Sequence, residues 1–242
     1  MSLKMYFGLA RTRSYLEAVA ALGPHATACG VDAFVIPDFV SLAAGAELLA
    51  GSGIALGAQD AFWEDAGAYT GEVSPAVLAE AGCSMVELGH AERRRLFGED
   101  DAVTARKAAA AARNGLVPLV CIGETTRDGE GAAAVSAAVA ECRPQVESVL
   151  AAVPDDSEVV LAYEPVWAIG QPQPASADHV VAVTQQLRAI AGARTGTTRI
   201  LYGGSAGPGL FASLAEGVDG LFLGRFAHDV AAFRDVITEL AA

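Results

Sequence analysis

The stretch Val159-Val160-Leu161-Ala162-Tyr163-Glu164-Pro165-Val166-Trp167-Ala168-Ile169-Gly170 decides the fold of this chain. Its apolar opening shows no polar alternation, which predicts a β-strand buried on both faces. Glu164 ends that strand, and partial burial there would make its carboxylate a stronger base. The loop that follows carries a proline, a tryptophan and a glycine, and is typical of a lid that closes and excludes water.

Further apolar runs of this kind alternate with Ala-rich helical stretches along the whole chain. The predicted strands are Leu3–Phe7, Ala33–Pro37, Ile54–Gln59, Met85–Gly89, Leu116–Ile122, Val159–Glu164, Arg199–Gly203 and Gly220–Gly224. The predicted helices are Arg13–Ala28, Val40–Ala50, Pro75–Ala81, Ala102–Asn114, Ala132–Ala152, Ala177–Ala191, Gly209–Ala215 and Val230–Ala241. Eight such repeats in 242 residues favour an α/β fold, a closed (β/α)8 barrel in a single domain over residues 1–242.

Composition excludes several classes of function. Sixteen basic against twenty-nine acidic residues give a net charge of −13, which argues against nucleic acid or an anionic membrane as partner. The four cysteines show no metal-type spacing, so free thiols in a reducing compartment are expected. No signal-peptide pattern and no apolar run of about 18 residues is present. We therefore expect a soluble cytoplasmic protein.

Chemically useful side chains cluster where the predicted strands end. They are Gln59, His90, Glu124, Glu164, Gly203-Gly204-Ser205 and Gly224. In a β/α barrel the carboxyl ends of all strands share one face, and that face carries the active site. Residues far apart in the sequence are therefore predicted to converge.

Two of these clusters suggest chemistry. His90 would begin a short helix, where the helix dipole disfavours the imidazolium form and leaves a neutral hydrogen-bond donor. Glycines after the last two strands let backbone N–H groups approach a phosphate closely.

The chain has only two lysines, Lys4 and Lys107, and Lys107 is predicted to lie on a solvated helix face. A Schiff-base lysine on a later strand is absent, which excludes that class of aldolase.

Several stretches together resemble triosephosphate isomerase over nearly the whole chain. They are Gly57-Ala58-Gln59, Gly67-Ala68-Tyr69-Thr70-Gly71-Glu72-Val73-Ser74-Pro75, Leu88-Gly89-His90-Ala91-Glu92-Arg93-Arg94, Phe97-Gly98-Glu99, Cys121-Ile122-Gly123-Glu124, the Glu164 loop and the turn Tyr202–Ser205. The order and spacing of these stretches carry the resemblance. It implies a TIM barrel.

The resemblance also implies roles for particular residues. Glu164 would remove a proton from the carbon next to a carbonyl, His90 would polarise that carbonyl, and Lys4 would offset negative charge. Glu92 would orient Lys4 and His90, and Trp167 would pack near Glu124. The lid would run from Pro165 through Val166, Trp167, Ala168 and Ile169 as far as Gln173. Substrate or phosphate contacts would come from Ser2, Gly170, Gly203, Gly204, Ser205, Gly224 and Arg225.

The same resemblance implies a homodimer with Thr70 and Gln59 at its contact, a small phosphorylated sugar as substrate, and a place in glycolysis and gluconeogenesis. It implies neither a metal nor an organic cofactor.

The chain departs from the family pattern at several positions. Ser2-Leu3-Lys4 stands where the family has Asn-Trp-Lys, and only Met1 precedes it, so either the chain starts late or Leu3–Phe7 forms a substitute strand with Lys4 shifted in register. Ala91 replaces a serine, and the far hinge of the lid, Gln171-Pro172-Gln173, contains a proline that would stiffen or relocate it.

Arg225 replaces a glycine. It would grip the phosphate, fill the pocket, or point away to pair with an acidic residue.

Three functions remain open at this stage. The first is interconversion of glyceraldehyde 3-phosphate and dihydroxyacetone phosphate through an enediolate. The second is the same chemistry on a related sugar phosphate, such as a tetrulose phosphate, because the altered positions surround the pocket while the base and the electrophile are kept. The third is a non-catalytic sugar-phosphate-binding paralogue.

Overall fold

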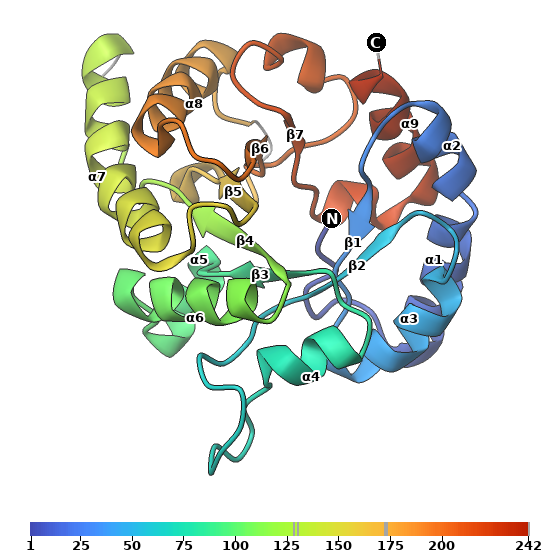
Figure 1. Ribbon diagram of the computed structural model, residues 1–242. Coiled ribbons are helices and arrows are strands. Elements are labelled where there is room, and N and C mark those ends of the chain that lie inside the picture. Colours follow the sequence, from blue (N-terminus) through green and yellow to red (C-terminus); the bar gives the residue numbers. More distant parts are fainter. Residues whose placement is uncertain (128, 130, 172–173, 242) are drawn as a thin grey trace.

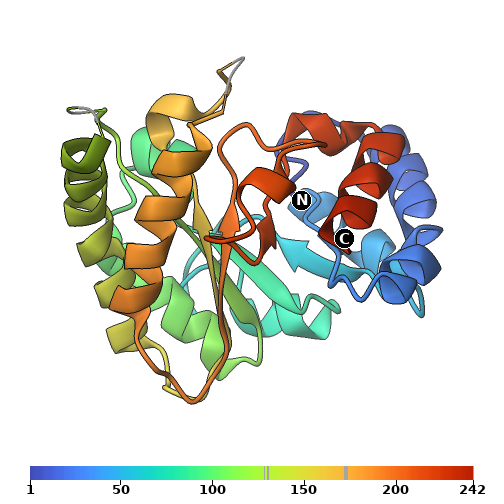
Figure 2. The same cartoon turned by 90° about the horizontal axis from the view of Figure 1, so that it is seen from above.

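The computed structural model describes residues 1–127, 129, 131–171 and 174–241 (Figure 1). Within these residues the chain forms one parallel sheet of seven strands in sequential order. The strands are β1 (Phe34–Val35), β2 (Ala55–Ala58), β3 (Met85–Leu88), β4 (Val117–Ile122), β5 (Val159–Tyr163), β6 (Thr198–Tyr202) and β7 (Gly220–Leu221). The sheet curls into a barrel wall with helices on its outer side (Figures 1 and 2), so the predicted α/β barrel is confirmed.

The predicted first strand is short and lies earlier than expected. Ser2 forms a parallel bridge with Ile36, while its backbone N–H donates to Leu223 O at 3.0 Å. Ser2 therefore joins the two edges of the sheet at the carboxyl ends of the strands. The prediction of a strand over Leu3–Phe7 is wrong, because Lys4 adopts a left-handed backbone conformation (φ 49°) that turns the chain out of the sheet.

The helices follow the predicted order with two differences. They are α1 (Leu9–Ala20), α2 (Gly23–Ala28), α3 (Leu42–Leu49), α4 (Pro75–Glu80), α5 (Ala91–Phe97), α6 (Asp101–Arg113), α7 (Gly131–Ala152), α8 (Ala177–Ala191) and α9 (Val230–Leu240). The helix predicted over Arg13–Ala28 is divided between α1 and α2, since Pro24 suits the first turn of a new helix. The helix predicted over Gly209–Ala215 is a single 3-10 turn, η3 (Phe211–Ser213).

Side chains alternate between two apolar layers along each strand. On β4, Leu119 and Cys121 face the barrel interior, whereas Val120 and Ile122 pack under the helices. The interior layer also contains Ile36, Met85, Val160, Ala162, Leu201 and Phe222. This alternation fixes which side chain at each strand end points toward the axis of the barrel.

The prediction that Lys107 is solvated is wrong. Its side chain is 3% exposed, and its ammonium lies 2.8 Å from Asp60 Oδ1 and 2.6 Å from Glu99 Oε1. Arg93 contacts the same two carboxylates from α5. Burial raises the pKa of Asp60, and the Lys107 charge opposes this rise. The cluster ties α6 to the start of the loop that follows β2.

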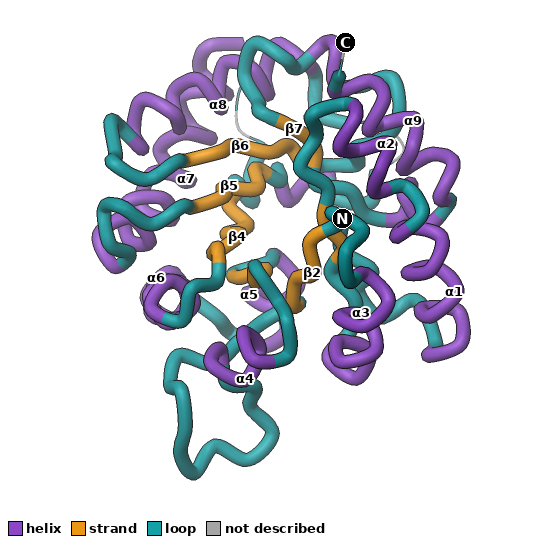
Figure 3. Tube along the Cα trace, turned by 45° about the vertical axis from the view of Figure 1, so that its right-hand side comes forward, coloured by secondary structure: helices purple, strands orange, loops and turns teal. Residues whose placement is uncertain are grey.

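The loop at residues 59–74, between β2 and α4, projects from the body of the barrel (Figures 1 and 3). It carries Thr70 at an exposed position. None of the helices in the described part of the chain has the length and apolar character that a bilayer crossing would require.

Candidate active site

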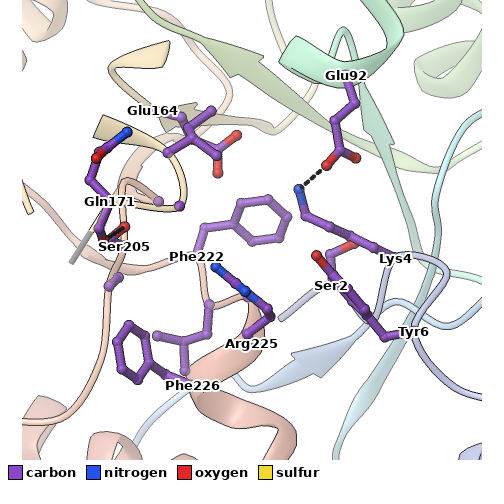
Figure 4. Close-up of a pocket in the computed structure, with 16 residues that line it drawn as sticks. Ser2, Lys4, Tyr6, Glu92, Glu164, Gln171, Ser205, Phe222, Arg225 and Phe226 are labelled. Carbon is purple, nitrogen blue, oxygen red and sulfur yellow. Dashed lines mark hydrogen bonds and ion pairs between the residues drawn. The ribbon is translucent and has the colours of Figure 1, made fainter. Parts of the chain in front are cut away.

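A cavity of about 600 Å³ opens at the carboxyl ends of the strands (Figure 4). Its wall takes residues from the N-terminal segment, from α5, and from the loops after β5, β6 and β7. Of the predicted strand-end residues, Glu164, Gly203, Ser205 and Gly224 line this cavity.

Glu164 directly follows β5 and is 7% exposed. Its backbone N–H donates to Ile122 O at 2.8 Å, which continues the pairing of β5 with β4 past the last strand residue. A Cβ on Gly203 would stand 2.5 Å from Glu164 Oε1, and one on Gly123 would stand 2.0 Å from Glu164 O. Gly203 thus leaves room for the carboxylate, and Gly123 leaves room for the backbone carbonyl of Glu164. Glu164 Oε2 lies 3.5 Å from His90 Nε2.

His90 caps α5 and is 4% exposed. Its Nδ1 accepts a hydrogen bond from the Glu92 backbone N–H at 3.1 Å. Because a backbone N–H is always a donor, this contact assigns the proton of a neutral imidazole to Nε2. Nε2 also lies 2.9 Å from Lys4 Nζ. With the proton on Nε2, the imidazole N–H and the Lys4 ammonium are both donors and make no hydrogen bond with each other, so an oxygen that gains negative charge beside Glu164 would accept from both.

Lys4 reaches the cavity in spite of the short first strand. Its ammonium lies 3.1 Å from Glu92 Oε1 (dashed line in Figure 4). Burial lowers the pKa of Lys4, but the charges of Glu164, Glu92 and Glu87 outweigh burial, and the pKa is raised overall. Burial raises the pKa of Glu92, but the charges of Lys4 and His90 outweigh burial and hold the pKa of this carboxyl below its ordinary value.

Gln59 explains how Lys4 keeps its unusual backbone. Its amide Nε2 donates to Lys4 O at 2.8 Å from the end of β2. A left-handed conformation costs a non-glycine residue roughly 1 to 2 kcal/mol, so an external hydrogen bond is needed to hold it. The sequence marked Gln59 as a strand-end residue, but not as the support of Lys4.

The opposite end of the cavity is formed by the backbone of the loops after β5, β6 and β7 and by the guanidinium of Arg225. Ser205 has φ 57° and its hydroxyl donates to Ala168 O at 3.0 Å. Gly170 has φ 73°, and a Cβ there would stand 3.8 Å from a guanidinium nitrogen of Arg225. Gly224 and Arg225 both line the cavity. In the part of the chain that the structure describes, no carboxylate pairs with Arg225.

The segment after Glu164 is anchored by its tryptophan. It contains the 3-10 turn η2 (Val166–Ala168), and the Trp167 indole donates to Glu124 Oε1 at 2.9 Å. Glu124 is 1% exposed and also accepts from the Tyr163 hydroxyl at 3.2 Å. Ile169 and Gly170 continue from η2 to the cavity wall. The expected hinge at Pro172 and Gln173 lies outside the described residues.

The family model described as triosephosphate isomerase matches residues 1–240. The chain belongs to the triosephosphate isomerase family. It is therefore an isomerase with the TIM-barrel fold, and the purely binding paralogue is set aside.

Three similar proteins carry the name L-erythrulose-1-phosphate isomerase. The protein from Pectobacterium atrosepticum is 46% identical, with 99% of this chain and 93% of that protein covered. The Brucella abortus protein is 41% identical over 99% of this chain and 94% of its own length. The Mesorhizobium japonicum protein is 38% identical over 100% and 96%.

The structure brings most of the site residues that were predicted from the family resemblance together at the cavity. Those at the cavity wall are Ser2, Lys4, Glu92, Glu164, Ile169, Gly170, Gly203, Ser205, Gly224 and Arg225. His90 contacts Lys4 from beside this wall. Gly204 lies instead against the Tyr202 hydroxyl, and Thr70 is on the projecting loop.

The sequence did not single out three aromatic residues of the wall, Tyr6, Phe222 and Phe226. Tyr6 lies two positions after Lys4, and Phe226 lies one position after Arg225. Their closeness in sequence to predicted site residues was the one signal that could have identified them.

Proposed function

We propose that this isomerase acts on a tetrulose phosphate and moves the ketone between the two central carbons. The observation that carries the proposal is the shared name of relatives that match this chain over almost its whole length, L-erythrulose-1-phosphate isomerase. The sequence left two isomerase functions open, and this shared name favours isomerisation of a tetrulose phosphate. The expected place in glycolysis and gluconeogenesis depended on the other function, isomerisation of a triose phosphate.

The chemistry of such a substrate suits the cavity. In a ketotetrose 1-phosphate, C1 carries the phosphate, C2 the ketone, C3 a hydroxyl and C4 a hydroxymethyl group. Loss of a proton from C3 gives an enediolate over C2 and C3. The hydroxyl proton then moves from the C3 oxygen to the C2 oxygen, and return of a proton to C2 leaves the ketone at C3 and a hydroxyl at C2. A triose phosphate follows the same path without C4. One arrangement of base and donors therefore serves both substrates.

In this proposal Glu164 removes the C3 proton and returns it to C2. His90 donates from Nε2 to the oxygens of the enediolate, and Lys4 offsets the charge that develops on them. The 3.5 Å between Glu164 Oε2 and His90 Nε2 leaves both groups facing one small volume. Glu92 positions the Lys4 ammonium through their 3.1 Å contact.

The phosphate is proposed to bind at the end of the cavity formed by Gly170, Ser205, Gly224 and Arg225. Turns rich in glycine allow backbone N–H groups to approach an anion closely, and the Arg225 fork matches phosphate oxygens. Gly203 and Gly204 contribute by shape, since a side chain at 203 would collide with Glu164 and one at 204 with the Tyr202 hydroxyl. The proposed lid is the segment from Pro165 to Gly170.

We also propose a homodimer in the cytoplasm. The loop at residues 59–74 projects from the barrel and carries Tyr69 and Thr70 at exposed positions. Met5, beside Lys4, is 94% exposed, and Phe97 at the end of α5 is 66% exposed. Exposed apolar side chains of this size are typical of contact surfaces. Gln59, at the base of the loop, completes the proposed contact, and the unpaired cysteines suit a reducing compartment.

A substrate panel tests the proposal. We expect kcat/KM for L-erythrulose 1-phosphate to exceed that for dihydroxyacetone phosphate at least tenfold. The other candidate, triose phosphate isomerisation, fits the same Glu164–His90–Lys4 geometry, which does not distinguish the two substrates. Turnover of the triose phosphate with none of the tetrulose phosphate would establish that candidate instead.

A further inference from the structure

Glu124 is a buried carboxyl group that collects three hydrogen-bond partners on one of its two oxygens. Its Oε1 accepts from the Trp167 indole at 2.9 Å and from the Tyr163 hydroxyl at 3.2 Å. His179 Nε2 lies 3.2 Å from the same oxygen and 3.2 Å from the Tyr163 hydroxyl oxygen. Glu124 Oε2 faces the Cys142 thiol, a weak donor, at 3.9 Å. The strong contacts are therefore concentrated on Oε1.

The contacts of His179 determine which ring nitrogen carries a proton. The Tyr163 hydroxyl has one proton, and it is donated to Glu124 Oε1. A His179 Nε2 without a proton would then face this carboxylate oxygen at 3.2 Å, with one lone pair against another. Nε2 must therefore carry a proton and donate it to Glu124 Oε1. Because Glu124 is 1% exposed, protein donors such as these, and not bulk water, satisfy its carboxylate.

Three donors are more than one carboxylate oxygen accommodates well, because each oxygen offers about two lone-pair sites. Two of the donors belong to regular structure, since Tyr163 is the last residue of β5 and His179 lies in the first turn of α8. Trp167 lies instead in the 3-10 turn η2, within the loop after β5. Trp167 is therefore the donor that can leave. Glu124 Oε1 then keeps two donors for its two sites, and its buried charge stays satisfied.

We propose that His179 is a positioning residue for the lid: by donating to Glu124 it lets Trp167 leave this carboxylate at low cost, and so sets the rate at which the segment from Pro165 to Gly170 opens. The inference rests on the lid of the proposed function. The His179 and Trp167 rings meet edge to face, with centroids 6.0 Å apart, so they separate when the indole leaves. Without His179, departure of Trp167 would leave Glu124 Oε1 with the Tyr163 hydroxyl alone, and opening would be slower.

Fluorine NMR of the protein labelled with 5-fluorotryptophan tests the inference. The chain has two tryptophans, Trp63 and Trp167, so two resonances are expected, and Trp63→Phe assigns them. Relaxation dispersion, recorded with and without glycerol 3-phosphate, gives the rate at which Trp167 leaves the conformer bound to Glu124. Trp63 belongs to the projecting loop at residues 59–74, and its resonance is an internal reference that should not respond to substitution of His179.

The expected effects separate a lost donor from lost packing. His179→Leu should slow the departure of Trp167 about 3- to 10-fold, the worth of one ordinary hydrogen bond. His179→Gln should stay within about twofold of wild type, because the glutamine amide nitrogen reaches the place of Nε2. His25→Leu removes a histidine that contacts Thr238, between α2 and α9, and is the matched control with no expected effect. Release of glycerol 3-phosphate, followed by stopped flow, should slow by the same factor in His179→Leu, whereas loosened packing would speed it.

Three results would overturn the inference: an unchanged or faster departure of Trp167 in His179→Leu, a His179→Gln variant that behaves like His179→Leu, or a wild-type protein in which Trp167 keeps a single conformer. If His179→Leu does not fold, His179→Asn takes its place, because its amide is too short to reach Glu124. A wild-type protein that shows the expected exchange of Trp167 but does not isomerise L-erythrulose 1-phosphate would end the proposed function and leave the role of His179 standing.

Discussion

Replacing Arg225 tests the proposed phosphate site directly. The guanidinium is exposed at the cavity wall beside Gly170, and in the described structure it is engaged by no carboxylate. A hydrogen-bonded contact between charged groups is worth about 1.5 to 3 kcal/mol, or roughly 10- to 150-fold in affinity. Solvent screening at an exposed site places the effect in the lower part of that range. We therefore expect Arg225→Ala to raise KM about 10- to 30-fold.

The effect should fall on KM and not on kcat, because the phosphate is bound alike in the ground state and the transition state. Arg225→Lys keeps the charge but loses the fork, so its KM should rise about threefold. Steady-state kinetics at several salt concentrations provide the assay, with Arg234→Ala on the exposed face of α9 as the control for the change in net charge. A KM for Arg225→Ala that matches the control would refute a phosphate contact.

Other substitutions test the parts that support the site. Gln59→Ala removes the 2.8 Å hydrogen bond to Lys4 O and should lower kcat about tenfold with KM little changed; unchanged kinetics would contradict its supporting role. Lys107→Met leaves Arg93 as the remaining cation beside the Asp60 and Glu99 carboxylates and should lower the urea unfolding free energy by about 1.5 to 3 kcal/mol, whereas a loss below about 1 kcal/mol would count against the cluster. Burial raises the folded-state pKa of Glu87 above its ordinary 4.5, so above that pH the unfolded chain binds fewer protons and stability falls. Glu87→Gln should therefore raise Tm more at pH 8 than at pH 4, and an equal shift at both would contradict this linkage.

The sequence predicted the barrel because its strands repeat the same signal. β4 and β5 are continuous apolar runs that end at a polar or glycine residue, and the pattern recurs between helices. The residues at these ends were consequently placed on one face before their distances were known. Glu164 and His90 are found 3.5 Å apart although 74 positions separate them in the chain.

What the sequence missed depends on three-dimensional context. Lys107 sits in an Ala-rich helix that looks solvated, and only the folded chain brings Asp60 and Glu99 to it. Lys4 turns away from the sheet because a glutamine from a later strand holds its carbonyl. Glu87 interrupts an apolar run without breaking it, so the strand was predicted while its unusual interior carboxyl was overlooked. Contacts between distant segments leave no local pattern to detect.

The most direct measurement follows solvent deuterium into the substrate. The wild-type protein and Glu164→Gln would each be mixed with L-erythrulose 1-phosphate in D2O, and NMR would report both the movement of the ketone and deuterium on C2 and C3. If Glu164 removes a proton to form an enediolate, deuterium accumulates on those carbons with the wild-type protein and not with the variant. Movement of the ketone without deuterium, or equal exchange by Glu164→Gln, would contradict proton transfer by Glu164.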